Sequence, residues 1–262
     1  MKLLLLGGTA DGRKLAAQLH EQGIEVIYSV AGLVRKAQLD CQVISGGFSQ
    51  RGGLANYLQQ EQITAVLDVT HPYAQQMSST AQSVCETEKL PYWRFHRPVW
   101  QAEAVDDWHG FSDWFELIAA LEKQLQATTA NEHAILFSIG QLDAKLLNLL
   151  DNMLKRYAEQ GSKLRLIVRT AAAPKIPLLP QMHWLKAIGP FHFADELALL
   201  QQHKITMMIS KNSGGDSTYP KLLAARQLQI PVFMQTRPKL KPLDNEFSDL
   251  ESCAKFVLQY AI

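Results

Sequence analysis

Residues 2–13 of the chain read KLLLLGGTADGR, which sets out a strand, a glycine turn and the beginning of a helix. The run of four leucines is typical of a strand buried on both faces of a parallel sheet. Gly7 and Gly8 allow a sharp turn and a close approach of the backbone to a ligand. The helix directs its free N–H groups at that turn, and Thr9 can cap it or donate its hydroxyl to a phosphate. This order favours a phosphate site, although GGT lacks the full GxGxxG fingerprint and a glycine pair can serve only as a turn.

Strand and helix patterns alternate along the remaining chain. Short apolar runs indicate strands at 2–6, 25–29, 42–45, 65–69, 92–95, 134–138, 164–168, 184–187, 205–210 and 232–236. Apolar residues at helical spacing indicate helices at 11–21, 53–60, 74–89, 111–126, 142–158, 194–202, 218–227 and 247–260. This alternation predicts an α/β fold with parallel sheets that helices cover on both faces.

The alternation breaks between residues 96 and 109, where HRPVWQAEAVDDWH has no clean period. We therefore expect two tandem Rossmann-like domains, residues 1–100 and 101–262, with the active-site cleft between them. Ligands of such sheets bind outside the carboxyl ends of the strands. The residues that follow each strand are therefore the candidate site residues.

The composition excludes several classes of protein. Lys and Arg number 26 and Asp and Glu 25, so the strong basic excess of a nucleic-acid binder is absent. The three cysteines, Cys41, Cys85 and Cys253, have no CxxC spacing, which predicts buried thiols of a cytoplasmic protein rather than disulfides or a zinc site. No segment approaches the ~20 apolar residues of a membrane span. We expect a soluble protein without a metal site.

The end of the second strand predicts the choice of cofactor. Folds that prefer NAD carry an acid about 20 residues past the glycines, where it binds the ribose hydroxyls. This chain has no acid in residues 28–32, and Arg35 and Lys36 follow shortly after. The cations and the Ser29 hydroxyl suit a 2′-phosphate, which favours NADPH. In the alternative interpretation, Arg35 and Lys36 are ordinary surface charges.

The third and fourth strands lead into two further candidate segments. GGFSQRGG, residues 46–53, allows backbone to approach a ligand closely or forms an ordinary flexible loop. DVTHPYA, residues 68–74, places Thr70 and His71 at a strand tip beside the expected nicotinamide. A lone histidine is often structural or exposed, but its position here makes it a candidate catalytic residue.

The second half repeats the pattern of strand, glycines and helix. ISKNSGG, residues 209–215, adds Lys211 to a helix N-terminus, a combination that can receive a carboxylate. Arg169 and Arg237 also follow predicted strands. Several cations at the carboxyl ends of one sheet indicate a polyanionic ligand.

Taken together, these segments resemble the precorrin-6A reductase family. The matching segments, in family order, are GGTADGR at 7–13, SVAG at 29–32, GGF at 46–48, DVTHPYA at 68–74, RPVW at 97–100, GPF at 189–191, KNSGG at 211–215, KLLAAR at 221–226 and RP at 237–238. They cover nearly the whole chain, and the THP and KNSGG segments together are specific.

The resemblance implies an enzyme of cobalamin biosynthesis that uses NADPH to reduce one carbon–carbon double bond of a tetrapyrrole, precorrin-6A or its cobalt form. Residues 1–100 would bind NADPH and residues 101–262 the substrate. The implied cofactor residues are Gly7, Gly8, Thr9, Arg13, Ser29, Ala31, Gly32, Arg35, Gly46, Gly47, Phe48 and Thr70. The implied catalytic residues are Thr70 and His71. The implied substrate residues are Lys211, Asn212, Ser213, Gly214, Gly215, Arg169 and Arg237.

The chain departs from the family pattern at Ser49 and Gln50, where further glycines are usual, and at Leu33, where an arginine is usual. Two other functions stay open: an NADPH oxidoreductase acting on another substrate, and a non-enzymatic NADPH-sensing module. A short-chain dehydrogenase would need a Tyr-x-x-x-Lys pair, which neither Tyr157 nor Tyr219 has. A sensor would not need the cationic strand ends.

Overall fold

The computed structural model describes residues 1–32 and 39–261, which form two compact units. Unit 1 comprises Met1–Pro98 and Pro238–Ile262, and unit 2 comprises Val99–Arg237. Each unit holds a six-stranded sheet whose neighbouring strands are all parallel. The predicted α/β class with parallel sheets is confirmed. Arg35 and Lys36 lie outside the described residues.

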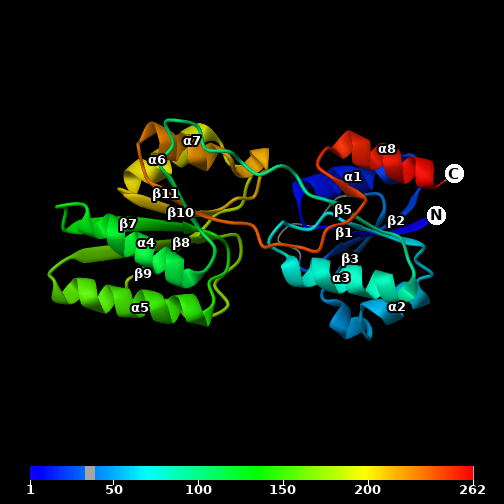
Figure 1. Cartoon of the computed structure of the whole chain (residues 1–262), viewed down its shortest axis with the longest axis horizontal. Helices are drawn as coiled ribbons and strands as arrows, with labels where there is room; N and C mark the ends of the chain where they lie inside the picture. The colour runs from blue at the N-terminus through cyan, green and yellow to red at the C-terminus, as the bar shows by residue number, and fades with distance from the viewer. Residues whose placement is uncertain (33–38, 262) are drawn as a thin grey trace. The chain divides into compact units, whose positions relative to one another are not determined.

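Unit 1 is built around β1 (Lys2–Leu6), in the strand order β12-β5-β4-β1-β2-β3. Its other strands are β2 (Glu25–Val30), β3 (Gln42–Ser45), β4 (Ala65–Asp68), β5 (Tyr92–Phe95) and β12 (Glu246–Phe247). Helices α1 (Ala10–Glu21) and α8 (Leu250–Tyr260) cover one face, and α2 (Leu54–Gln60) and α3 (Gln75–Glu88) cover the other (Figure 1). A 3₁₀ turn, η1 (Phe48–Arg51), follows β3.

Unit 2 has the strand order β6-β11-β10-β7-β8-β9. The strands are β6 (Trp108–Phe111), β7 (Glu132–Ser138), β8 (Lys163–Thr170), β9 (Met182–Lys186), β10 (Met207–Lys211) and β11 (Val232–Gln235). Helices α4 (Trp114–Gln126) and α5 (Ala144–Glu159) pack on one face, and α6 (Phe193–Gln202) and α7 (Pro220–Gln227) on the other. A 3₁₀ turn, η2 (Asp216–Thr218), precedes α7.

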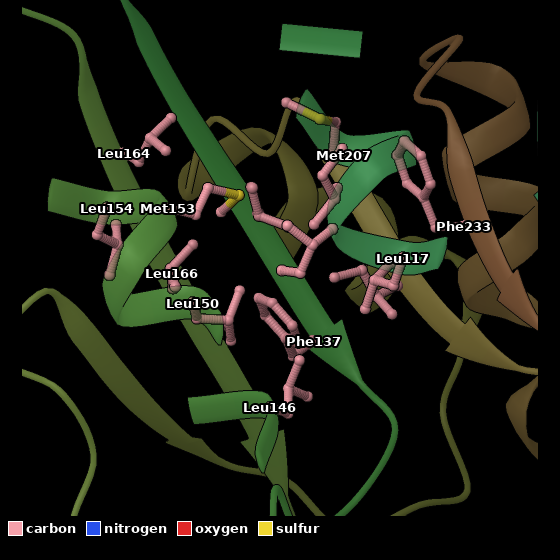
Figure 2. Packing of buried hydrophobic residues seen from close by; sticks show 14 of the residues in the cluster. Leu117, Phe137, Leu146, Leu150, Met153, Leu154, Leu164, Leu166, Met207 and Phe233 are labelled. Atoms are coloured by element: carbon pink, nitrogen blue, oxygen red, sulfur yellow. The ribbon is translucent and has the colours of Figure 1, made fainter. Parts of the chain in front are cut away.

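Alternate residues of each central strand enter opposite cores, because successive side chains of a strand point to opposite faces. Leu3 and Leu5 pack with α1 and α8, whereas the other two leucines of β1 pack with α2 and α3. Figure 2 shows one core of unit 2, in which Phe137 of β7 lies beside Leu146 and Leu150 of α5. Burial on both faces explains why these strands read as continuous apolar runs.

Two short edge strands differ from the sequence-based expectation. The crossing segment and the predicted helix at 111–126 contain β6, and the predicted helix at 247–260 begins with a residue of β12. The helices themselves begin later, after Asp113 and Asp249, whose carboxylates cap the first turns of α4 and α8. Edge strands are half-exposed, so neither shows the buried apolar run that identifies a central strand.

The expected boundary also differs at the C-terminus. The second domain was expected to extend over 101–262, but the chain leaves unit 2 at Arg237 and returns to unit 1. There β12 pairs with β5, and Cys253, Ala254 and Val257 of α8 enter the core behind β1. Helical spacing shows that α8 has an apolar face, but not which sheet that face covers.

We predict that α8 unfolds together with the rest of unit 1. Leu5→Ala removes a fully buried side chain of β1 and should destabilise unit 1 by about 2–5 kcal/mol. Native-state hydrogen exchange should then become at least roughly thirtyfold faster in α8 and β1, with less effect on α7. The matched change Leu136→Ala, at a buried leucine of β7, should give the reverse pattern. Exchange of α8 that follows Leu136→Ala instead would contradict the assignment.

Candidate functional site

The strand order of unit 1 reverses between β1 and β4, so the segments after these strands meet at the carboxyl edge of the sheet. Thr9 joins them. Its hydroxyl donates to the Val69 carbonyl at 3.0 Å and accepts from the Gly12 N–H, also at 3.0 Å. Thr9 is the N-cap of α1, which leaves the N–H groups of Ala10 and Asp11 as the remaining donors of the first turn.

The glycine turn between β1 and α1 passes closely over a buried tyrosine. A Cβ atom at Gly7 would lie 2.1 Å from Cε2 of Tyr28, so no other residue fits there. Gly8 has a φ of +110°, and its N–H donates to the Tyr28 hydroxyl at 2.9 Å. Burial raises the pKa of Tyr28, which keeps this hydroxyl protonated. The bare backbone beside a capped helix N-terminus fits a phosphate group.

A buried carboxylate holds the segment after β4. Asp68 is fully buried, and its Oδ1 accepts the Thr70 N–H at 2.9 Å while its Oδ2 accepts the Tyr92 hydroxyl at 2.7 Å. Burial, and then the Asp68 charge, raise the pKa of Tyr92, so the phenol stays a donor. The Thr70 hydroxyl lies 3.2 Å from that of Ser78. Thr70 is therefore fixed at both backbone and side chain.

His71 comes next and is half-buried at the same edge. Its Nδ1 accepts the Tyr73 N–H at 3.3 Å, and the two rings lie 5.6 Å apart. Arg97 pairs with Asp11 of the first turn of α1 at 3.2 Å, and both line a small hollow that Thr9 and Thr70 also line. The structure thus brings the GGT and THP segments together.

The remaining cofactor residues predicted in unit 1 lie along the same edge or in the first turn of α1. Arg13, Ala31, Gly32 and Gly47 are exposed, Gly46 and Phe48 are half-buried, and Ser29 is buried. The Ser29 carbonyl accepts the Gly7 N–H at 2.8 Å, so this residue also holds the glycine turn. The Phe48 ring packs against Tyr57 at 5.3 Å, and Gly46 has a φ of +100°.

In unit 2 the strand order reverses between β7 and β10, where Ser138 and Ser210 are partners in register. The predicted substrate segment Lys211–Gly215 begins at the last residue of β10. The Asn212 side chain exchanges two hydrogen bonds with the Trp100 backbone, at 2.8 and 3.0 Å, and the Asn212 carbonyl accepts from Arg237 Nε at 2.8 Å. The structure thus joins three segments that are distant in sequence.

Arg169 takes part in a buried ionic cluster at this edge. Its Nη1 donates to both Glu196 oxygens, at 2.6 and 2.8 Å, and its guanidinium stacks over Phe191 at 4.7 Å. Lys221 of α7 is also buried, and burial lowers its pKa to about 7. Lys221 Nζ and Arg169 Nη2 both donate to the Ser138 hydroxyl, at 3.2 and 3.0 Å. The Arg169 charge is therefore balanced mainly by Glu196.

The chain is similar to known proteins over nearly its whole length. The family described as precorrin-6x reductase CbiJ/CobK matches residues 2–258. The chain belongs to this family. A precorrin-6A reductase of Rhodococcus erythropolis is 33% identical over 98% of this chain and 97% of that protein. A cobalt-precorrin-6A reductase of Priestia megaterium is 25% identical over 91% of each. A solved structure described as CobK precorrin-6A reductase is 31% identical over 99% of this chain and 97% of that one, with a TM-score of 0.79.

Membership confirms the family predicted from the sequence. The chain is an oxidoreductase of the precorrin-6A reductase family, and its reaction is a reduction step of cobalamin biosynthesis that uses a nicotinamide cofactor. Among residues 1–32 and 39–261, no helix is long and apolar enough to cross a membrane. The same residues contain no group of three or more His, Cys, Asp or Glu side chains that could hold a metal ion.

Sequence reasoning missed the residues that hold this reductase's motifs in place. Tyr28 under the glycine turn reads as an ordinary strand residue, and Glu196 reads as a helix surface charge. Lys221 belongs to a family segment, but the spacing of apolar residues does not predict that it is buried. Most of the surface of α7 is buried, so the helix has no single apolar face that would mark its buried residues. For Ser138, the sequence indicates only that it is the last residue of a central strand.

We predict that Gly7→Ala destabilises unit 1 and weakens dinucleotide binding together. The new methyl group overlaps the Tyr28 ring, and such overpacking typically costs about 1–3 kcal/mol. Gly47→Ala is the matched control for stability alone, because its Cβ meets only the Ser49 side chain at 3.4 Å and its φ is −77°. Thermal unfolding and equilibrium binding of NADPH measure both effects. Equal stability of the two variants would show that the turn does not lie over Tyr28.

Proposed function

We propose that the chain reduces one carbon–carbon double bond of precorrin-6A, or of its cobalt form, with NADPH as the reductant. The observation that carries the proposal is the meeting of the GGT and THP segments at the switch point of a Rossmann-like sheet, in a chain that matches the reductase family over nearly its full length. Of the relatives compared above, the precorrin-6A reductase is 33% identical to this chain, and the cobalt-precorrin-6A reductase is 25% identical. This difference favours the metal-free pigment.

The residues of unit 1 suit a dinucleotide. Gly7 and Gly8 have no side chains to cover the backbone of the turn. Thr9 caps α1, so that the N–H groups of its first turn point to the position a pyrophosphate would take. Gly32 and Gly46, which follow the neighbouring strands, allow the same close approach at the ribose. When bound, the cofactor supplies a hydride from its nicotinamide ring. The reduction also consumes one proton, so the pigment gains two hydrogens in all.

Thr70 and His71 are the proposed catalytic residues of unit 1. Asp68 and Ser78 hold Thr70 in one position, so its role is to orient the nicotinamide rather than to carry a proton. His71 can deliver a proton from Nε2, since Nδ1 already accepts a hydrogen bond from the Tyr73 backbone. A rigid threonine beside a histidine suits a reaction that depends mostly on positioning.

The carboxyl edge of unit 2 is the proposed binding region for the carboxylates of the pigment. Lys211 and Arg237 both lie there, and Arg237 holds the backbone of the Lys211–Gly215 segment through Asn212. Burial removes part of the water around the Lys211 ammonium and so lowers its pKa. A partly desolvated cation gains more from a carboxylate than a fully hydrated one.

We place the enzyme in the cytoplasm. Cys41, Cys85 and Cys253 are free thiols in the cores of unit 1. Burial raises the pKa of Cys85 and of Cys253 to about 12, so neither thiol is reactive at neutral pH. Reduced, unreactive thiols are typical of a reducing compartment.

The direct test is a product assay. The enzyme is mixed with precorrin-6A and, separately, with its cobalt form, each with NADPH or NADH, and the pigment is followed by mass spectrometry. We expect a gain of two hydrogens with NADPH and precorrin-6A. No gain with either pigment despite tight NADPH binding would overturn the proposed substrate and favour the sensing module.

The choice of NADPH depends on residues 35 and 36 of the sequence. If Arg35 or Lys36 contacts the 2′-phosphate, Arg35→Ala or Lys36→Ala should weaken NADPH binding by about 1.5–3 kcal/mol, the usual loss for a charge-assisted hydrogen bond. NADH binding should change little, because NADH lacks that phosphate. Lys255→Ala, at an exposed lysine of α8, is the control. Equal weakening of both cofactors would contradict the assignment.

A further inference from the structure

The Ser138 hydroxyl occupies an unusual position at the switch point of unit 2. It ends the central strand β7, is partly exposed, and accepts hydrogen bonds from Arg169 at 3.0 Å and Lys221 at 3.2 Å. A serine hydroxyl has two acceptor lone pairs and one donor hydrogen. Both acceptor positions are filled when Lys221 is charged, so the hydrogen must point elsewhere. No residue in the described part of the chain accepts it.

The charges around this hydroxyl are not balanced. Arg169 and Glu196 are 5% and 1% exposed and form one buried ion pair. Lys221 is 3% exposed, and its ammonium adds a second buried cation against the single carboxylate. The Trp100 ring lies 5.9 Å from Lys221 Nζ and helps to exclude water. A buried cation without a full counter-charge is costly, and an anion beside Ser138 would reduce that cost.

We propose that the Ser138 hydroxyl is an anion-binding donor, which Arg169 and Lys221 polarise and which donates a hydrogen bond to one carboxylate of the substrate. This inference rests on the proposed function, because the carboxylate is taken to belong to the tetrapyrrole. Glu196 and Lys221 are positioning residues that act through Arg169 and Ser138. The two cationic donors strengthen the hydrogen bond that the Ser138 hydroxyl donates outward, since hydrogen bonds in a chain polarise one another.

The proton on Lys221 decides whether the donor is available. The charged groups that face Lys221 are Arg169 of β8, Glu196 of α6 and Lys211 of β10. Burial, and then the charges of Arg169 and Lys211, lower the pKa of Lys221, Glu196 raises it, and the net pKa is about 7. Below that pKa the ammonium donates to Ser138, whose hydrogen is directed outward. Above it the neutral amine can accept that hydrogen, so anion binding weakens as the pH rises.

The first experiment compares Ser138→Ala with Ser138→Thr, which keeps the hydroxyl. Precorrin-6A binding is followed by pigment absorbance without NADPH, and turnover is measured separately. Ser138→Ala should raise the dissociation constant and KM of the pigment roughly tenfold to a hundredfold, with NADPH affinity unchanged. Ser138→Thr should restore most of the affinity. Ser210→Ala, at the register partner whose hydroxyl donates to the Lys211 carbonyl, is the matched control.

The second experiment uses the unmodified enzyme, so it does not depend on a variant that folds. Pigment affinity should be highest below pH 7 and should fall as the pH rises to 9, by at most tenfold per pH unit. Calorimetry in two buffers of different ionisation enthalpy at pH 7.5 should show proton uptake on binding. Lys221→Met should flatten both effects, whereas Lys163→Met, at an exposed lysine of β8, should not.

Two results would overturn the inference. One is a Ser138→Ala enzyme that binds pigment as tightly as the unmodified enzyme, and the other is pigment binding without pH dependence or proton uptake. Failure of the proposed function looks different, because it is the absence of a two-hydrogen gain with either pigment. If the unmodified enzyme gives the two-hydrogen gain but Ser138→Ala does not change pigment binding, only the proposed role of Ser138 is rejected.

Discussion

The ring of Tyr28 determines where the chain can turn after the first strand. It lies in the core of unit 1, directly under Gly7, and its hydroxyl holds the Gly8 N–H. Only a backbone without a side chain can cross the ring at that distance. The path set by this contact places Thr9 where its hydroxyl reaches both Val69 and Gly12. The first turn of α1, the end of β4 and the proposed phosphate site all depend on that position.

The two units use different forces at equivalent places. In unit 1 the switch point is built from backbone groups, a threonine hydroxyl and the Asp68 carboxylate, which pack tightly around the α1 N-terminus at the proposed phosphate site. In unit 2 the switch point is built from buried ions. Desolvating Arg169 and Glu196 is expensive, and their two short hydrogen bonds offset part of that cost. Such a pair is weak support for stability, but it fixes the direction in which Arg169 presents Nη2 to Ser138.

The path of the chain explains why each unit is complete only when a distant segment joins it. In unit 2 the edge strand β6 precedes the other five strands, and in unit 1 the edge strand β12 follows all others by a long insertion. Arg94 strengthens the second junction. It is buried in β5, and its Nη1 donates to the Lys241 carbonyl at 3.2 Å and to the carboxylate of Glu246 in β12 at 3.4 Å. The return segment is thus held by ionic contacts as well as by the apolar face of α8.

The sequence by itself determined the α/β class, most of the strands and helices, and the family. Buried parallel strands require apolar runs, helix caps favour Asp or Thr, and sharp turns favour glycine. Each of these features can therefore be recognised from a few neighbouring residues. It also placed the GGT, THP and KNSGG segments at strand ends. Only the tertiary structure decided that α8 covers β1, that β6 and β12 complete the sheets, and that Ser138, Glu196 and Lys221 meet at one point. These are contacts between residues far apart in the chain, and whether a lysine or a glutamate is buried depends on what packs over it rather than on its neighbours in sequence.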